Sequence, residues 1–256
     1  MALKDRLESI REIVRTENKV IVSDLSKRFG VTEETIRRDL EKLEDEGVIT
    51  RTYGGAVLNP DENVKRVSFT RRAMTNTKEK RAMASIAASL VPDKAAIAAD
   101  ASSTVMEVIR LLSNRSDLLV VTFSTSILHE MEGAEIGVMS TGGVLNKQSL
   151  SLQGAIACNT IGSYHTDIAF VSCKGLHLTE GALDTDDAEA ELKRLMISRS
   201  QKAVLLADHT KFGRMAFSKL FDIDKVSTVI TDYKPSDEWI QLLAEKHIEL
   251  LYPENV

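Results

Sequence analysis

The sequence contains little of what several protein classes require. It has only two cysteines, Cys158 and Cys173, without CxxC spacing or a nearby histidine pattern, so neither a disulfide framework nor a zinc site is expected. Aromatic residues make up 5% of the chain, too few for a stacking platform for single-stranded nucleic acid. Apolar runs stop short of the roughly 18 residues of a membrane span, and the first ten residues lack the apolar core of a signal peptide. We therefore expect a cytoplasmic protein without metal or cofactor.

An excess of positive charge is also absent. The net charge is −5, and residues 1–58 hold eleven Lys and Arg against twelve Asp and Glu. This balance excludes a uniformly basic nucleic-acid-binding protein. Any DNA binding must therefore depend on a few cationic side chains placed on one face.

Residues 1–58 nevertheless have the order of a winged helix-turn-helix domain. Apolar spacing predicts a helix over residues 4–16 and another over 24–29, with Ser23 as the N-cap and Gly30 at the end. Thr32 is predicted to cap a third helix, whose first turn is acidic. Two short apolar stretches around a Gly-Gly turn then predict a hairpin, the wing.

The third helix is predicted to enter the DNA major groove with its N-terminal end first. Arginines there can pair with guanine edges or phosphates, and threonine hydroxyls can reach phosphates. Such an arginine pair alone is more often a solvated helix face, but the whole series in this order is more specific. The residues predicted to contact DNA are Thr32, Thr35, Arg37, Arg38, Arg51, Gly54 and Gly55.

Residues 59–76 form a polar segment, predicted to be a connector. Over residues 77–256, nearly continuous apolar strands alternate with amphipathic helices, a pattern that predicts a mostly parallel sheet covered on both faces. The fold class is thus α/β with an N-terminal winged helix-turn-helix. The strands are expected near 95–99, 118–123, 136–140, 167–172, 203–207, 226–231 and 247–252.

Several of these strands end in polar loops. The sequence DASST, from Asp100 to Thr104, follows one strand and opens a helix. Small residues, hydroxyls and a helix N-terminus favour an anion such as phosphate, although a plain helix cap has the same composition. Because such loops meet at the carboxyl edge of a parallel sheet, we expect one effector site. Its predicted residues are Asp100, Ser102, Ser103, Thr104, Ser124, Gly142, Gly143, Lys174, Asp208 and Lys211.

Both halves resemble the DeoR family of transcription regulators. The N-terminal match is the sequence VTEETIRRDL at 31–40 with the later Gly-Gly-Ala, and the sensor match includes DASST, the glycines at 142–143, SLQG at 151–154, and LADHTKFG at 206–213. The resemblance implies an operator-reading domain and a sensor domain similar in fold to ribose-5-phosphate isomerase and CoA transferases. Ser102 and Phe123 depart from the usual family residues. The DASST and SCKG sequences look like those of regulators of deoxy-sugar use, such as rhamnose.

The function predicted from these features is a DNA-binding repressor of a carbohydrate-use operon. Its partners would be double-stranded operator DNA, a phosphorylated sugar that releases or modulates it, and further copies of the chain, because repeated half-sites mirror protein symmetry. One alternative is a sugar-phosphate isomerase or hydrolase, with Asp100, Asp208 and Lys211 as acid and base groups. Another is a redox sensor that uses Cys158 or Cys173.

Overall fold

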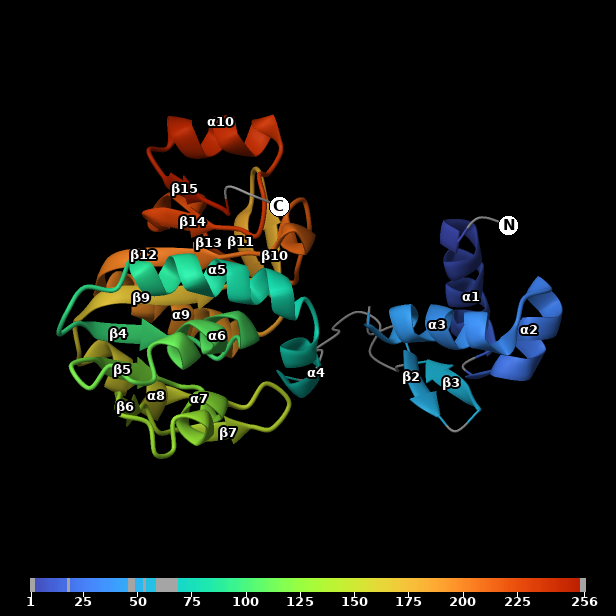
Figure 1. The fold of residues 1–256 in the computed structure, drawn as a ribbon, viewed down its shortest axis with the longest axis horizontal. Coiled ribbons are helices and arrows are strands. Elements are labelled where there is room, and N and C mark those ends of the chain that lie inside the picture. The colour runs from blue at the N-terminus through green and yellow to red at the C-terminus, as the bar shows by residue number, and fades with distance from the viewer. Residues whose placement is uncertain (1–2, 18, 46–48, 53, 59–68, 254–256) are drawn as a thin grey trace. The chain divides into compact units, whose positions relative to one another are not determined.

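The computed structural model describes the chain except for residues 1–2, 18, 46–48, 53, 59–68 and 254–256. The chain divides into two compact units, Met1–Arg66 and Val67–Val256, which are described separately (Figure 1). In the described part of the chain, no helix has the length and apolar character to cross a membrane.

The N-terminal unit combines three helices with a small antiparallel sheet. The sheet has the strand order β1-β3-β2, and its hairpin follows the third helix as predicted. Ile10, Val14, Ile36 and Leu40 pack in the shared core. The winged helix-turn-helix fold is therefore confirmed. The elements are α1 (Leu3–Glu17), β1 (Lys19–Ile21), α2 (Val22–Phe29), α3 (Glu33–Asp45), β2 (Ile49–Thr52) and β3 (Gly55–Leu58).

The second helix begins one residue before its predicted cap. Ser23 lies inside α2, and the N-cap position is held by Ile21, which has no side-chain cap bond. The reason is the sheet: Ile21 pairs with Gly55 in β3, so the backbone stays extended up to the first helical residue. At the other end, Gly30 adopts a left-handed conformation with φ 63°, as expected of a glycine that ends a helix.

A seven-stranded parallel sheet forms the centre of the C-terminal unit. Its order is β15-β14-β12-β9-β4-β5-β6, and every neighbouring pair is parallel. All carboxyl ends of these strands therefore lie at one edge. The strands are β4 (Ala96–Ala99), β5 (Leu119–Thr122), β6 (Gly137–Ser140), β9 (Thr166–Ser172), β12 (Ser200–Leu206), β14 (Thr228–Ile230) and β15 (Glu249–Leu251).

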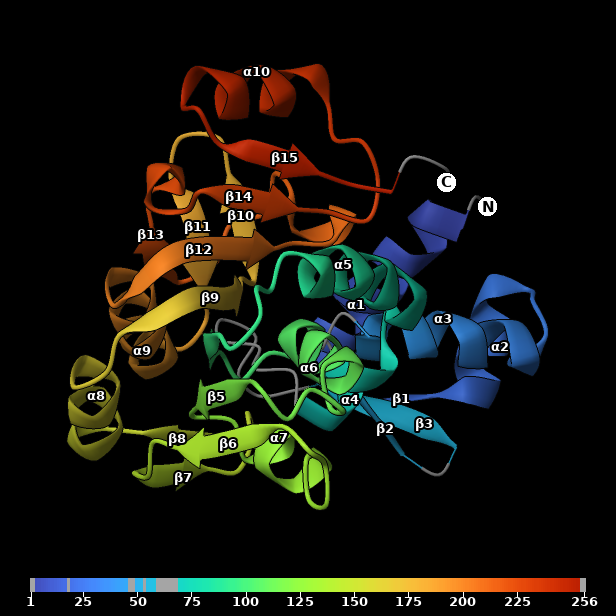
Figure 2. The ribbon, with the colours of Figure 1, turned by 60° about the vertical axis from the view of Figure 1, so that its left-hand side comes forward.

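Helices cover both faces of this sheet, as Figure 2 shows. Side chains of a strand alternate between the faces: Ile168 and Phe170 of β9 pack in the core under α5 and α6, whereas Ala169 packs against Leu192 and Met196 of α9. The predicted α/β fold is confirmed. The helices are α5 (Thr77–Ser89), α6 (Ser103–Leu111), α7 (Thr125–Glu130), α8 (Ala155–Gly162), α9 (Asp187–Ser198) and α10 (Asp237–Glu245).

Five short strands that the sequence pattern did not predict form two smaller antiparallel sheets. One is the hairpin β7-β8 and the other has the order β10-β11-β13. Each follows the carboxyl end of a main-sheet strand, so both small sheets are inserted at the edge where ligands bind in such folds. Their bounds are β7 (Val144–Asn146), β8 (Ser151–Gln153), β10 (Gly175–His177), β11 (Gly181–Asp184) and β13 (Ser218–Phe221).

The predicted connector, residues 59–76, contains a helix. Residues 59–68 lie outside the described residues, and α4 (Phe69–Met74) follows. Phe69 is buried in the core of the C-terminal unit, and its amide donates to the carbonyl of Gln148 at 2.9 Å. The apolar pair Phe69 and Ala73, spaced i and i+4, gives even this short segment a face that packs. Residues 69–74 therefore belong to the C-terminal unit.

Candidate functional site

The start of α3 is held by two threonines. The Thr35 amide donates to Oγ1 of Thr32 at 3.2 Å, and the two hydroxyl oxygens lie 2.8 Å apart. This confirms Thr32 as the helix cap. Arg37 and Arg38 follow one turn later, and both are exposed. The arrangement presents two cations near the N-terminal end of the helix that is predicted to read DNA.

Both arginines are paired with acids of their own helix. Arg37 lies 2.8 Å from Glu33, and Arg38 lies 3.6 Å from Glu34. Exposed pairs of this kind contribute only about 0–1 kcal/mol, so DNA phosphates can replace the carboxylates at little cost. The pair between Arg6 and Asp39 differs, because Asp39 is 2% exposed and holds α1 against α3.

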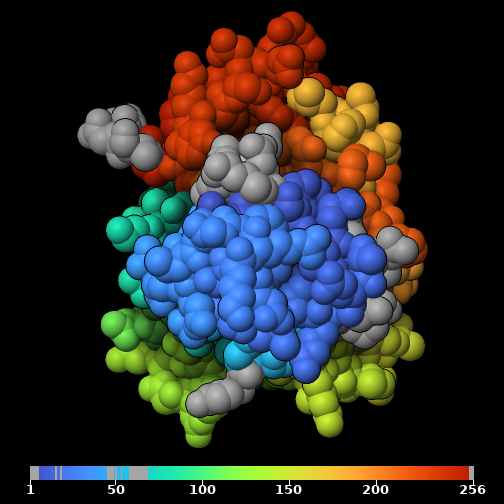
Figure 3. Space-filling model, turned by 90° about the vertical axis from the view of Figure 1, so that its right-hand side faces the viewer, coloured from blue at the N-terminus to red at the C-terminus, as the bar shows by residue number. Residues whose placement is uncertain are grey.

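The two wing glycines have different structural reasons. Gly54 is exposed and has φ 99°, a conformation that favours glycine. Gly55 is buried, and a Cβ atom there would lie 2.1 Å from the carbonyl oxygen of Val20. Gly55 is thus needed where β1 meets β3. Figure 3 shows the surface of this unit, in blue. Arg51 is exposed and lies 4.0 Å from Glu44.

In the C-terminal unit, Asp100 is tied to the protein itself. One carboxylate oxygen accepts from the Ser102 amide and the other from the Ser172 amide, both at 2.9 Å. Lys193 of α9 lies 3.3 Å from Asp100 and 2.6 Å from Asp184. Asp100 was predicted to meet an effector hydroxyl, but these contacts give it a structural role that joins the ends of β4 and β9.

The lysine at this centre is fully engaged. Lys193 is 1% exposed, and its ammonium donates to the carbonyl of Ser172 at 2.8 Å as well as to Asp184. Burial lowers the pKa of Lys193, but Asp184 and Asp100 outweigh it and raise the pKa above its usual value. Burial raises the pKa of Asp184, yet Lys193 and Lys174 bring it down to about 2. Both partners therefore stay charged.

The predicted phosphate cradle is a well-formed helix start. Oγ of Ser102 accepts from the Val105 amide at 3.1 Å, and Oγ of Ser124 accepts from the Ile127 amide at 3.2 Å. These two hydroxyls therefore act as caps of α6 and α7. Ser103 and Thr104 are buried in the first turn of α6, where helix N–H groups favour an anion.

A group of basic residues interacts through its charges in the same unit. Burial, with the charges of Lys211 and Arg72, lowers the pKa of Lys80 to about 8, while Asp208 acts in the opposite direction. Burial also brings the pKa of Lys174 to about 8, with Arg72 adding to the effect. Arg72 thus interacts with both Lys80 and Lys174, and Lys211 interacts with Lys80; these four residues are called the cation cluster. Lys80 and Arg72 were not among the predicted effector residues.

Asp208 turns its carboxylate inward beside this cluster. It accepts from the Thr210 amide at 2.9 Å and lies 3.7 Å from Lys211. Burial raises the pKa of Asp208, but Lys211 and Thr210 lower it overall. The carboxylate stays ionised and starts the 3-10 turn His209–Lys211. With Asp100 and Asp208 both holding loops in place, the acid and base set of the enzyme alternative has no unengaged carboxylate.

Gly142 and Gly143 shape the adjoining loop. Their φ angles are 67° and 117°, and a Cβ atom on Gly143 would lie 2.6 Å from the carbonyl oxygen of Gln153. Glycine is thus required for the loop to pass close to β8. The two glycines border a group of polar side chains from β7, β8 and α9.

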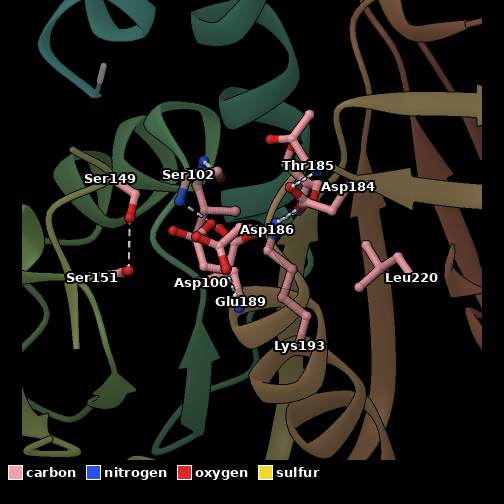
Figure 4. Close-up of polar contacts among 12 residues, drawn as sticks. Asp100, Ser102, Ser149, Ser151, Asp184, Thr185, Asp186, Glu189, Lys193 and Leu220 are labelled. Carbon is pink, nitrogen blue, oxygen red and sulfur yellow. Dashed lines mark hydrogen bonds and ion pairs between the residues drawn. The ribbon is translucent and has the colours of Figure 1, made fainter. Parts of the chain in front are cut away.

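This polar group was missed by the sequence reasoning. Asp186 accepts from Asn146 at 3.2 Å and from Gln153 at 3.4 Å, and it caps α9 through the amides of Ala188 and Glu189. Figure 4 shows Asp186 and Glu189 beside Asp100 and Lys193. Only the unpredicted small hairpin brings Asn146 and Gln153 to α9, so spacing along the chain could not reveal the group.

The two cysteines are free, and Cys173 is buried. Burial raises the pKa of the Cys173 thiol to about 12, and burial also raises the pKa of Cys158. Thiols rather than reactive thiolates are present at neutral pH. These environments argue against the redox-sensor alternative.

The fold and these surfaces define a DNA-reading winged helix-turn-helix joined to an α/β sensor domain. The chain belongs to the DeoR family of transcription regulators: the DeoR-like helix-turn-helix domain matches residues 6–62, and the DeoR C terminal sensor domain matches residues 75–233. The chain is accordingly a DNA-binding regulator, and the resemblance seen in the sequence is confirmed.

Several curated relatives match over almost the full length. "Uncharacterized HTH-type transcriptional regulator YulB" of Bacillus subtilis is 38% identical over 98% of this chain and 96% of its own. "HTH-type transcriptional repressor GlcR" of the same organism is 32% identical, covering 100% and 98%. "Glycerol-3-phosphate regulon repressor" of Escherichia coli is 30% identical, covering 98% and 99%. All three are regulators by name, which places this chain with regulators rather than enzymes.

Solved structures give weaker likenesses. Ribose 5-phosphate isomerase A of Methanocaldococcus jannaschii has 19% identity and a TM-score of 0.41, with 54% of this chain and 55% of that chain covered. The sorbitol operon regulator SorC of Klebsiella pneumoniae has 12% identity and a TM-score of 0.39, with 98% and 96% covered. Likenesses at this level carry no argument about activity or ligand.

Proposed function

We propose that this chain represses a carbohydrate-use operon and that a phosphorylated sugar controls its affinity for operator DNA. The single observation that carries the proposal is the cation cluster of Arg72, Lys80, Lys174 and Lys211: the carbonyls of Arg72 and Thr75 hold the Lys80 ammonium, which interacts with Lys211 and with Glu107 of α6, while Lys174 interacts with Arg72. Burial and the charge of Arg72 bring the pKa values of Lys80 and Lys174 to about 8, and a bound dianion would stabilise the charged form of both lysines. A phosphate group provides such a dianion with several acceptor oxygens.

The names of two relatives support the same class of effector and the sign of regulation. One is called a repressor of a glycerol-3-phosphate regulon, and another is a repressor of the same domain organisation. The likeness to regulators of deoxy-sugar use stays a prediction. Ser103, Thr104 and the amides at the start of α6 are proposed to bind the phosphate together with Lys174 and Lys211.

The effector is proposed to act through α4. Lys80 Nζ donates to the backbone carbonyl of Arg72 and, at 2.6 Å, to that of Thr75. The same lysine is coupled to Asp208 and Lys211. A phosphate bound between Lys80 and Lys211 would thus change the contacts that fix α4, the helix within the predicted connector. A ligand that favours one arrangement of α4 shifts the population of DNA-binding states.

A DNA-release assay tests the proposal. Operator DNA is selected by the purified chain from a random double-stranded library, and its binding is followed by fluorescence anisotropy while hexose and polyol phosphates are added. We expect at least one phosphate ester to change DNA affinity, and Lys211→Ala to keep DNA binding but lose that response. Lys219→Ala, an exposed lysine on β13, is the control. The proposal fails if no phosphate ester changes DNA binding.

A further inference from the structure

Glu189 is a buried carboxylate, and one of its two oxygen atoms lacks a hydrogen-bond donor. It is 2% exposed, and its Oε1 atom has no hydrogen-bond partner in the described part of the chain. Leaving a buried charged acceptor unsatisfied costs more than leaving a neutral one. Glu189 lies in the first turn of α9, and Asp186 is the N-cap of the same helix. A donor from outside the protein would therefore find an acceptor already in place.

Three neighbouring side chains direct their hydrogen-bond donors elsewhere, and Lys174 interacts with Glu189 only through its charge. The nearby ammonium of Lys193 is directed at the Ser172 carbonyl and at two other carboxylates. The amide groups of Asn146 and Gln153 donate to Asp186. Asp186 itself is a carboxylate and donates nothing when ionised. The group of polar side chains Asn146, Gln153, Asp186 and Glu189, which is called the recess, is thus rich in acceptors.

The chemistry of the recess selects hydroxyl groups over a metal ion. The described residues contain no group of three acidic, His or Cys side chains placed to hold a metal. Lys193 and Lys174 are close enough to Glu189 for their charges to interact, and they would repel a cation. A sugar hydroxyl is neutral and donates one hydrogen to a carboxylate, which gives a strong, charge-assisted bond.

The recess also adjoins the cation cluster. Lys174 interacts with Arg72 on one side and with Glu189 and Asp184 on the other. Ser124, at the start of α7, lies opposite Ser151 in a backbone bridge, and the Ser151 hydroxyl accepts from Gln153 at 3.0 Å. A ligand with an anionic end and a hydroxylated chain would therefore meet both regions at once.

We infer that Glu189 accepts a hydrogen bond from a hydroxyl of the effector, and that the recess around it reads the polyhydroxylated end of a phosphate ester. This inference rests on the proposed function for the phosphate end. It assigns the specificity for the carbon chain to β7, β8 and α9 rather than to the loop from Asp100 to Thr104, whose carboxylate is already engaged.

Calorimetry on the full chain tests the binding of the phosphate end and the reading of the hydroxylated end separately. Fructose 1-phosphate, glucose 6-phosphate, glycerol 3-phosphate and inorganic phosphate are titrated, together with fructose, glucose and glycerol. We expect Glu189→Gln to weaken the tightest phosphate ester roughly tenfold, as loss of a charge-assisted bond implies, while inorganic phosphate is unaffected. Asp186→Asn retains the helix cap and should act in the same direction. Glu191→Gln, exposed on the same helix, should change nothing.

Each contrary result contradicts either the inference about Glu189 or the proposed phosphate requirement. If no ester binds the wild-type chain more tightly than inorganic phosphate, or if Glu189→Gln leaves the ester affinity unchanged, the donor to Glu189 is water and the inference is wrong. If sugars without phosphate bind as tightly as their esters and still depend on Glu189, the recess is correct and the proposed phosphate requirement fails. Thermal unfolding of each variant confirms that the fold is retained.

Discussion

Arg37 and Arg38 test the DNA-reading assignment at the scale of single residues. Their partners Glu33 and Glu34 are exposed, so neither arginine contributes much to the fold. We expect Arg37→Ala and Arg38→Ala to weaken operator binding without loss of stability. A base-reading arginine should cost about 1–3 kcal/mol of binding free energy at its position, and a phosphate contact should lower the salt slope by about one unit. Anisotropy titrations at several salt concentrations decide between these roles, and unchanged operator affinity in both variants would contradict the assignment.

Lys193 is expected to matter for stability instead. Lys193→Met leaves Asp100 and Asp184 buried without their cation, and breaking a buried pair in this way costs about 3–5 kcal/mol. Lys202→Met is the matched control, because Lys202 pairs with Glu249 on the surface and such pairs contribute about 0–1 kcal/mol. Urea unfolding measures the free energy of unfolding of both variants. Equal losses would show that the Lys193 network contributes no more to stability than a surface ion pair.

The basic cluster also predicts a pH dependence. The pKa values of Lys80 and Lys174 lie near 8, so both lose protons between pH 7 and 9, while a phosphate ester with a second pKa of about 6 is already a dianion. Effector affinity should therefore fall as pH rises, by up to about tenfold for each lysine that must be charged. The free energy of unfolding changes in the opposite direction. Lysines of the unfolded chain keep their protons to about pH 10.4, so the contribution of Lys80 and Lys174 to stability increases as the pH rises above about 8.

Calorimetry at pH 7, 8 and 9 measures the affinity trend. Repetition in buffers of different ionisation enthalpy shows whether protons are taken up on binding. Constant affinity with no proton uptake would place the phosphate away from these two lysines.

At the scale of elements, the parallel sheet followed directly from sequence because its strands are continuous apolar runs. The small strands were missed for a physical reason. Gly175 and Gly181 are positions where a Cβ atom would strike the neighbouring backbone, and strands this short show no periodicity to detect. The predicted DNA-contact residues Thr32, Thr35, Arg37 and Arg38 lie at the start of the third helix as expected from the sequence, and their role stays a prediction. Nothing in the local spacing shows that Asp100 pairs with Lys193 or that Glu189 is buried.

Helix α4 carries the prediction on signalling. Phe69→Ala removes the side chain that anchors α4 in the core of the C-terminal unit, and buried Phe→Ala changes cost about 3–5 kcal/mol. We expect this variant to bind phosphate esters in calorimetry but to show a weaker effect of the ester on DNA affinity. Met74→Ala, on the same helix with a side chain 77% exposed, is the control. A normal DNA response from a folded Phe69→Ala variant would mean that the signal does not pass through α4.

At the scale of the whole molecule, we expect the chain to need a second copy to read DNA specifically. One helix-turn-helix offers few base contacts, so a symmetric dimer on repeated half-sites is expected. Val144 and Leu145 of β7 and Ile156 of α8 are exposed at 74%, 46% and 64%, and the Gly142 Cβ position lies 3.4 Å from Ile156. We predict that these exposed apolar side chains belong to an association surface.

We expect the wild-type chain to be at least a dimer in light scattering and the double variant Val144→Asp, Ile156→Asp to be a monomer. Charges placed in an apolar interface remain unpaired when it closes, whereas Leu111→Asp, on the exposed side of α6 at 57%, should leave the oligomer intact. The monomeric variant should bind one half-site weakly and lose the added affinity of a two-half-site operator, because the two contacts no longer act together. A wild-type chain that is monomeric both free and on DNA would refute the dimer, and a double variant that still dimerises would move the interface away from β7 and α8.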